Sequence, residues 1–126
     1  MRIQLCLLVA SLLLSFGVNA QADFKFEKRV QKFEKVKADT LLSFDFFFEN
    51  TGDEPLIISE VNVSCGCTKP TFPKEPIAPG KKSKIQVTFD TKGKMGYQDR
   101  TLEIVSNASN PKERIRFKGV VDHKKL

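Results

Sequence analysis

The chain has 126 residues, of which 40% are hydrophobic and 29% are charged, and its formal net charge at pH 7 is +6. Most of the positive charges are lysines scattered along the sequence, so they do not form the arginine-rich stripe typical of a nucleic-acid-binding surface. The length allows one domain with one core. We therefore expect a solvated, basic surface and no nucleic-acid partner.

The N-terminal segment has the three parts of a secretory signal peptide. Arg2 gives a short positive region, residues 5–16 form an apolar run, and small residues lead up to Ala20. The apolar run, at roughly a dozen residues, is shorter than the about 20 needed to span a bilayer. We predict cleavage between Ala20 and Gln21, which leaves no membrane-spanning segment.

Cleavage at that position divides the chain into a signal peptide, residues 1–20, and one domain, residues 21–126. Cys6 is removed with the signal peptide, so the exported domain keeps two cysteines, Cys65 and Cys67. An exported protein meets an oxidising compartment in which disulfides persist. The expected location is the periplasm or the cell exterior.

Alternation of apolar and polar residues predicts short β-strands along the rest of the chain. The first segment also has partly helical spacing, but we favour two short strands there. The predicted strand segments are residues 24–37, 41–49, 55–63, 84–90, 97–106 and 114–121. The side chains predicted to point inward from the last five segments are Leu42, Phe44, Phe46, Phe48, Ile57, Val61, Val63, Ile85, Val87, Phe89, Leu102, Ile104, Ile115, Phe117, Gly119 and Val121.

Turn-forming residues separate these segments. Glycine supplies positive φ, proline fixes φ, and asparagine or aspartate bonds its own backbone. The turn sequences include Asn50-Thr51-Gly52-Asp53, Ala78-Pro79-Gly80 and Asn107-Ala108-Ser109-Asn110-Pro111. Short strands at this spacing predict an all-β sandwich or barrel, with the phenylalanines packed in its core.

The sequence Cys65-Gly66-Cys67 places two thiols two residues apart. In an extended chain both side chains would leave the same face. Two extended residues span about 6.6 Å, near the upper limit of the Cα separation that a disulfide accepts. A Cys65–Cys67 disulfide therefore requires a bend at Gly66.

Three roles are open for Cys65 and Cys67. They shape a turn, as a disulfide or as packed thiols, or they bind a soft metal ion such as Cu(I), or they exchange disulfides, with Lys69 favouring the thiolate. Zinc is less suitable because a closed site takes four ligands and the exported chain adds only His123. We expect no catalytic residue and no enzyme activity other than thiol redox chemistry.

Several motifs occur together in a fixed order: Asn50-Thr51-Gly52-Asp53-Glu54-Pro55, then Cys65-Gly66-Cys67-Thr68, then Ile77-Ala78-Pro79-Gly80-Lys81. With them, residues 41–121 resemble a bacterial exported family of unknown function, common in Bacteroidetes-like envelopes and marked by a Cys-Gly-Cys-Thr signature. That family is similar in fold to immunoglobulin-like domains of the major sperm protein, hydin and PapD type.

The resemblance implies a single immunoglobulin-like β-sandwich of about seven strands in the cell envelope of a Gram-negative bacterium. It also implies a binding or scaffolding role and brings no enzymatic activity. The expected partner is another envelope protein or peptide that adds a strand to a sheet edge.

Overall fold

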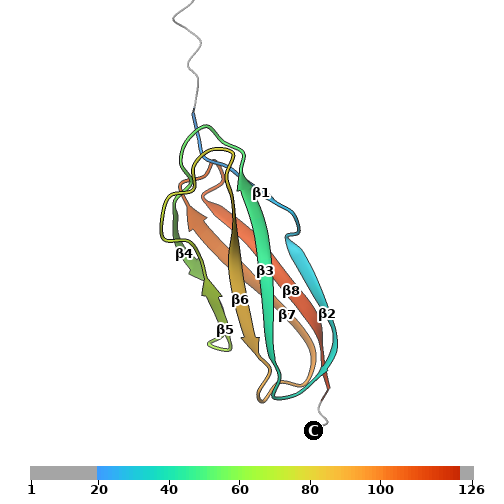
Figure 1. Cartoon of the computed structure of the whole chain (residues 1–126). Coiled ribbons are helices and arrows are strands. Elements are labelled where there is room, and N and C mark those ends of the chain that lie inside the picture. Colours follow the sequence, from blue (N-terminus) through green and yellow to red (C-terminus); the bar gives the residue numbers. More distant parts are fainter. Residues whose placement is uncertain (1–19, 123–126) are drawn as a thin grey trace, which may run out of the picture.

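The computed structural model describes residues 20–122, which form two β-sheets packed face to face (Figure 1). Residues 1–19 of the predicted signal peptide and His123 lie outside the described part. Within residues 20–122, no helix is long and apolar enough to cross a membrane. The strands are β1 (Phe24–Phe26), β2 (Val30–Lys37), β3 (Leu41–Asn50), β4 (Ile58–Asn62), β5 (Thr68–Thr71), β6 (Lys82–Asp90), β7 (Gly96–Ser106) and β8 (Lys112–Asp122).

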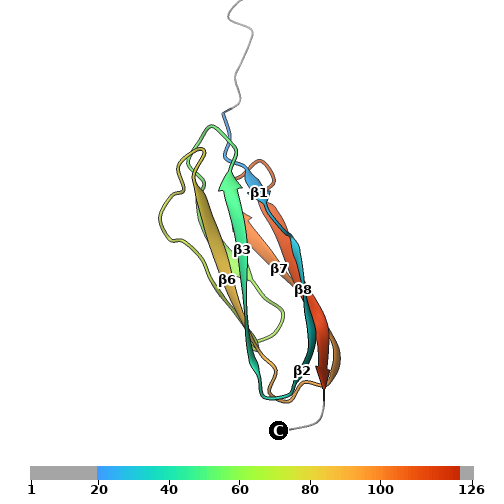
Figure 2. The ribbon, with the colours of Figure 1, turned by 45° about the vertical axis from the view of Figure 1, so that its right-hand side comes forward.

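The first sheet has the order β1-β3-β6-β5 and the second the order β2-β8-β7-β4. All neighbours are antiparallel except β2 and β8, which are parallel. The expected immunoglobulin-like sandwich is confirmed. The N-terminal segment forms two strands, as predicted, and they join different sheets (Figures 1 and 2). The structure has eight strands because β5 adds one that the alternation did not predict.

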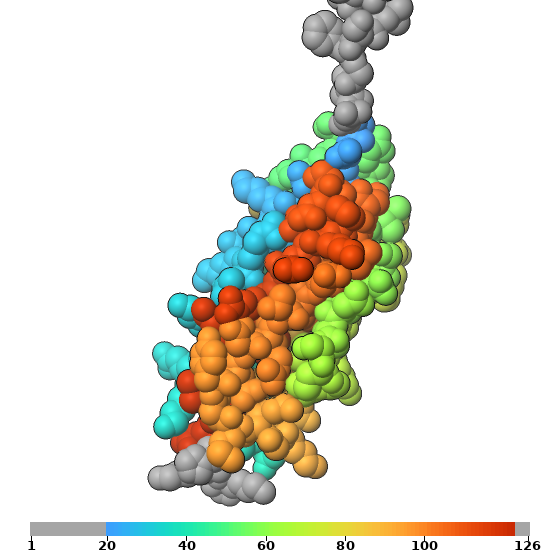
Figure 3. All heavy atoms as spheres, turned by 180° about the vertical axis from the view of Figure 1, so that it is seen from behind, coloured from blue at the N-terminus to red at the C-terminus, as the bar shows by residue number. Residues whose placement is uncertain are grey.

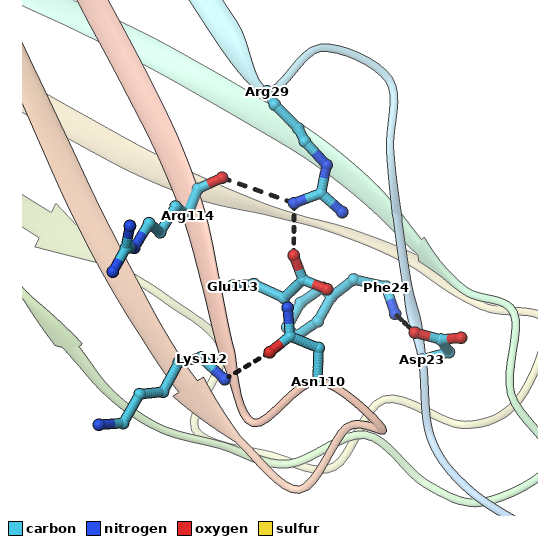
Figure 4. Close-up of polar contacts among 7 residues, drawn as sticks. All are labelled: Asp23, Phe24, Arg29, Asn110, Lys112, Glu113 and Arg114. Carbon is cyan, nitrogen blue, oxygen red and sulfur yellow. Dashed lines mark hydrogen bonds and ion pairs between the residues drawn. The ribbon is translucent and has the colours of Figure 1, made fainter.

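A partly buried ion pair fixes the point at which the chain crosses from β1 to β2. The Arg29 guanidinium donates a hydrogen bond to the carboxylate of Glu113, a buried residue at the start of β8 (Figure 4). The Arg29 guanidinium also lies 4.9 Å from the Phe26 ring centroid. The Arg29 carbonyl oxygen accepts the N–H of Arg116 at 2.8 Å, which begins the parallel pairing of β2 with β8.

Phenylalanine side chains fill the space between the sheets, as predicted. Phe44 stacks on Phe117 with ring centroids 4.8 Å apart, and Phe89 lies 5.0 Å from Phe117. The predicted inward residues of β3, β6, β7 and β8 are buried or, for Leu42, packed against the core. Phe47 is the exception to the expectation that the phenylalanines pack, because it points outward from β3 and is 47% exposed.

The inward residues predicted for segment 55–63 are partly wrong. Ile57 is 46% exposed and Val63 is also exposed, whereas Leu56 and Ile58 are buried. Leu56 is held inward because its backbone exchanges two hydrogen bonds with Ile77, both at 2.8 Å. An irregularity between Ile58 and Glu60 then shifts the alternation by one residue, which returns Val61 to the core side.

A buried asparagine joins three separate segments at one end of the sandwich. The Asn50 side chain is fully buried. Its Oδ1 accepts the N–H groups of Asp23 (3.2 Å) and Gly52 (3.0 Å). Its Nδ2 donates to the carbonyl oxygens of Glu54 (2.8 Å) and Ile77 (2.9 Å). Asn50 therefore ties the segment before β1, the turn after β3 and the loop before β6 together.

Asn50→Asp should lower the free energy of unfolding by about 3 kcal/mol, because an oxygen would replace the amide donor, remove its two hydrogen bonds and face the carbonyl oxygens of Glu54 and Ile77. Urea denaturation measures the change. Asn62→Asp, at an exposed asparagine that ends β4, is the matched control and should shift stability by less than about 0.5 kcal/mol. Equal effects of the two substitutions would contradict this role.

Gly119 lets β2 lie close over β8. A Cβ atom at this position would lie 2.5 Å from the Phe33 carbonyl oxygen and would also meet the Phe33 ring. Phe33 cannot retreat easily, because its ring packs against Phe44 and Phe89. The missing side chain thus allows the only parallel pairing among the described strands.

Gly119→Ala should destabilise the protein by about 2 kcal/mol through overpacking. Gly66→Ala is the control, because a Cβ at Gly66 would meet nothing within 4 Å, and it should leave stability unchanged or raise it by up to about 1 kcal/mol. Thermal or chemical unfolding of both variants compares them. A Gly119→Ala protein as stable as the Gly66→Ala protein would show that β2 can move away.

Candidate functional site

The cysteine pair lies in the connection from β4 to β5, which passes from one sheet to the other. Cys65 and Cys67 are joined by a disulfide, and their Cα atoms are 5.2 Å apart. This is shorter than the about 6.6 Å of an extended segment, so the chain bends at Gly66. The Thr68 N–H donates to the Cys65 carbonyl oxygen at 3.1 Å and closes the turn.

The turn is attached to the first sheet at its lower end in Figure 1. The Cys67 carbonyl oxygen accepts the N–H of Asp90, the last residue of β6, at 2.9 Å. The Cys67 N–H donates to the sulfur of Cys65 at 3.2 Å. The two sulfurs therefore differ: Cys65 accepts a backbone N–H at 3.2 Å, whereas Cys67, which packs partly against the core, has only the longer contact with the Thr68 hydroxyl, at 3.7 Å.

Metal binding by Cys65 and Cys67 stays a prediction for the reduced protein, because neither sulfur of a disulfide is a thiolate. Among residues 20–122, no group of three or more histidine, cysteine or acidic side chains is placed to hold a metal ion. His123, the further ligand considered for zinc, lies outside those residues.

A groove of about 300 Å³ crosses the outer face of the first sheet beside Cys67. Lys69 on β5, Lys92 after β6 and Leu41 on β3 line it, together with Asp90. Cys67 borders the groove and Cys65 does not. The sequence indicated Lys69 by its proximity in the chain, but it gave no signal that Leu41 and Lys92 would join the same surface.

A second feature is the open edge of β3. The backbone N–H and C=O groups of its even-numbered residues point toward β6, as the hydrogen bond from the Asn50 N–H to the Lys81 carbonyl oxygen shows. The backbone groups of the odd-numbered residues therefore point to the other side. These residues are Leu41, Ser43, Asp45 and Phe47. There β1 pairs with residues 48–50 of β3 alone. Within residues 20–122, no strand pairs with this side of residues 41–47.

Two contacts occupy the upper part of this edge. The Glu27 N–H donates to the Phe47 carbonyl oxygen at 3.0 Å, and the Gln31 side chain donates to the Asp45 carbonyl oxygen at 2.6 Å. A hollow of about 240 Å³ lies there, between β2 and β3. Leu41 is 69% exposed, so two large apolar side chains, Leu41 and Phe47, flank the edge on its outer face.

The other sheet edges are short or irregular. β1 has three residues, while β2 and β4 each have a break in register. On β5, Thr68 and Pro70 direct their backbone groups away from β6; the Thr68 N–H is used in the turn, and proline has no N–H. Such features block the addition of further strands, so the β3 edge is the longest regular edge in the described part of the chain.

The outer face of the second sheet carries ion pairs of its own. Figure 3 views β7 and β8 from this side. Arg116 donates two hydrogen bonds to Asp99, one of them at 2.6 Å, and Arg114 lies 4.0 Å from Glu103. The hydrogen bond from Arg116 lowers the pKa of the Asp99 carboxyl below its ordinary value, and the same bond raises the pKa of Arg116.

Two four-stranded sheets packed face to face define an immunoglobulin-like sandwich. The family described as "Protein of unknown function (DUF1573)" matches residues 24–121, and the chain belongs to this family. The expectation of a family of unknown function with this fold is confirmed. A comparison with curated proteins finds no match.

Solved structures share the fold at low sequence identity. A protein of unknown function from Porphyromonas gingivalis W83 is similar with a TM-score of 0.72 and 15% identity, over 83% of this chain and 50% of that one. The chain thus spans half the length of that protein. PapD-like domain 7 of human CEP192 has a TM-score of 0.64 and 10% identity, over 88% and 93% of the two chains.

The YadV chaperone is also similar, with a TM-score of 0.53 and 16% identity over 82% of this chain and 53% of that one. The VesB protease of Vibrio cholerae has a TM-score of 0.58 and 14% identity, but only 32% of it is covered. These likenesses show the fold.

Acid should remove the contribution of the Asp99–Arg116 ion pair to the stability of the folded protein. Because the pKa of Asp99 is lowered in the folded state, its stabilisation is present above the ordinary pKa of aspartate and is lost as the pH falls through the folded value. Asp99→Asn should therefore lower the melting temperature slightly at pH 7 and have no effect in strong acid. Asp53→Asn, in the exposed turn after β3, is the control. If Asp99→Asn lowered the melting temperature more in acid than at pH 7, the result would contradict the predicted pH dependence.

Proposed function

We propose that the protein is a non-enzymatic binding module of the bacterial cell envelope, and that it binds an extended segment of another envelope protein or peptide along the open edge of β3. The observation that carries the proposal is the unpaired side of residues 41–47, the longest regular edge among the described strands. An added strand would continue, along residues 41–47, the pairing with β3 that β1 makes only as far as Phe26.

The edge offers both parts of strand recognition. Backbone N–H groups at Ser43, Asp45 and Phe47 supply hydrogen bonds that do not depend on the partner's sequence, and side-chain positions beside the edge supply specificity. Leu41 and Phe47 project to the same face, so alternate apolar residues of the partner would cover them. Burying these two side chains would contribute a few kcal/mol.

The charges around the edge are mixed. Lys28 borders the hollow beside Phe47 together with Glu27 and Asp45. Lys84 lies 3.4 Å from the carboxylate of Asp45 on the outer face. A partner segment with alternate apolar residues and little net charge would match this surface.

Three features support a location in the envelope. The N-terminal segment has the pattern of a signal peptide ending at Ala20. The packed fold begins directly after it, since the Gln21 carbonyl oxygen accepts the Asp53 N–H at 2.8 Å. A disulfide also suits an oxidising compartment. We infer export to the periplasm or cell exterior of a Gram-negative bacterium.

Site-specific photo-crosslinking in the producing cells tests strand addition. A benzoylphenylalanine at Phe47 should give a discrete adduct with a partner chain, and Ser43→Pro should abolish it, because proline removes an N–H from the open edge while sparing the backbone hydrogen bonds to β6. Circular dichroism checks that the variant stays folded. The control probe at Tyr97, an exposed aromatic on the second sheet, should give no adduct.

Two outcomes would count against the proposal. One is an adduct of equal yield from the probe at Tyr97. The other is an adduct from Phe47 that persists in a folded Ser43→Pro protein. Replacing Cys65 and Cys67 together with serine should leave the adduct intact, and its loss would instead point to a thiol-dependent partner.

A further inference from the structure

The cysteine pair has features that strand addition at β3 does not use. A disulfide that serves only to hold a turn needs neither an adjoining groove nor a hydrogen bond to one of its sulfurs. Here Cys67 borders a groove of about 300 Å³, while the sulfur of Cys65 accepts a backbone N–H at 3.2 Å. We propose that this disulfide exchanges with cysteine thiols of client proteins and that Cys67 is the sulfur they attack.

The hydrogen bond sets the direction of attack. When a thiolate attacks one sulfur of a disulfide, the other leaves as a thiolate, and exchange is faster when that leaving thiolate is more stable. The Cys67 N–H is already placed to stabilise negative charge on Cys65, whereas the donor beside Cys67, the Thr68 hydroxyl, lies farther from its sulfur, at 3.7 Å. Hydrogen bonds to charged atoms are strong enough to shift an equilibrium about tenfold or more, so Cys65 is the better leaving group.

The exchange is balanced without a further reactant. A client thiolate bonds to the Cys67 sulfur, the Cys65–Cys67 bond breaks, and Cys65 leaves as a thiolate that takes a proton from water. A second thiol of the client then attacks the client sulfur of this mixed disulfide and releases Cys67. The client dithiol is oxidised to a disulfide, and the cysteine pair is reduced to two thiols by the same two electrons.

The groove indicates the chemistry of the client. Lys69 and Lys92 contribute positive charge, and Leu41 contributes an exposed apolar side chain. The carboxylate of Asp90 accepts the backbone N–H of Lys92 at 3.0 Å. The groove therefore fits a cysteine in an acidic, partly apolar segment better than one in a basic segment.

The site of attack can be measured with glutathione, an anionic thiol, as the probe. The full chain carrying Cys6→Ser is equilibrated with glutathione, quenched with acid, alkylated and mapped by mass spectrometry. Glutathione should be found on Cys67 and the alkyl group on Cys65, with about a tenfold preference. A synthetic peptide of residues 62–70 is the control and should show a smaller preference, because no folded sheet holds its turn with the Cys67 N–H on Cys65.

Two results would overturn the proposal. One is glutathione on Cys65 as often as on Cys67. The other is the absence of any mixed disulfide under conditions in which dithiothreitol reduces the pair, which would leave the disulfide a structural element only. Circular dichroism of the reduced protein shows whether the fold persists. If the reduced protein unfolds, the initial rate of glutathione attack on the oxidised protein still tests the proposal, because the oxidised protein is folded when the attack occurs.

The charge preference gives an independent measurement. Each rate for the oxidised protein is divided by the rate at which the peptide of residues 62–70 reacts with the same thiol. After this correction, the protein should react several-fold faster with glutathione than with cysteamine, a cationic thiol. The double substitution Lys69→Gln and Lys92→Gln should remove this difference. Lys82→Gln, at the other end of β6, is the matched control and should keep it. Loss of the difference in the control, or its persistence in the double variant, would contradict the role of the groove.

Discussion

The hydrogen bonds of the Asn50 side chain hold together the end of the sandwich at which the described chain begins. This amide satisfies two donors and two acceptors from segments that are distant in the sequence. Without it, the start of β1, the turn after β3 and the loop before β6 would bring backbone groups into the interior without partners. The position of β1 depends on this arrangement, and where β1 ends decides how much of the β3 edge is open.

Alternation in the sequence predicted the faces of β3, β6, β7 and β8 because these strands pair regularly along their length. It failed for Ile57 and Val63, where a long-range pairing with Ile77 and an irregularity in β4 set which side chains turn inward. β5 was not predicted at all. Four residues that include Pro70 carry no strand pattern, and only their pairing with β6 makes them a strand.

For the candidate sites, the spacing of residues along the sequence predicted local geometry, but it did not predict which distant residues come together in the fold. The two-residue separation of Cys65 and Cys67 already required a bend at Gly66 for any bridge. The groove beside Cys67, however, is assembled from Leu41, Lys69 and Lys92 on different strands and loops, which no local pattern brings together. The open edge is similar: the outward position of Phe47 follows from alternation, but the early departure of β1 does not.

The parallel pairing of β2 with β8 has a mechanical consequence. In Figure 1, the described chain enters at one end of the sandwich and β8 ends at the opposite end. Tension between these two points would pull β2 and β8 in opposite directions along their common axis. Their interstrand hydrogen bonds would then be loaded together in shear instead of being opened one after another, so this pair would resist stretching of the domain between those two points.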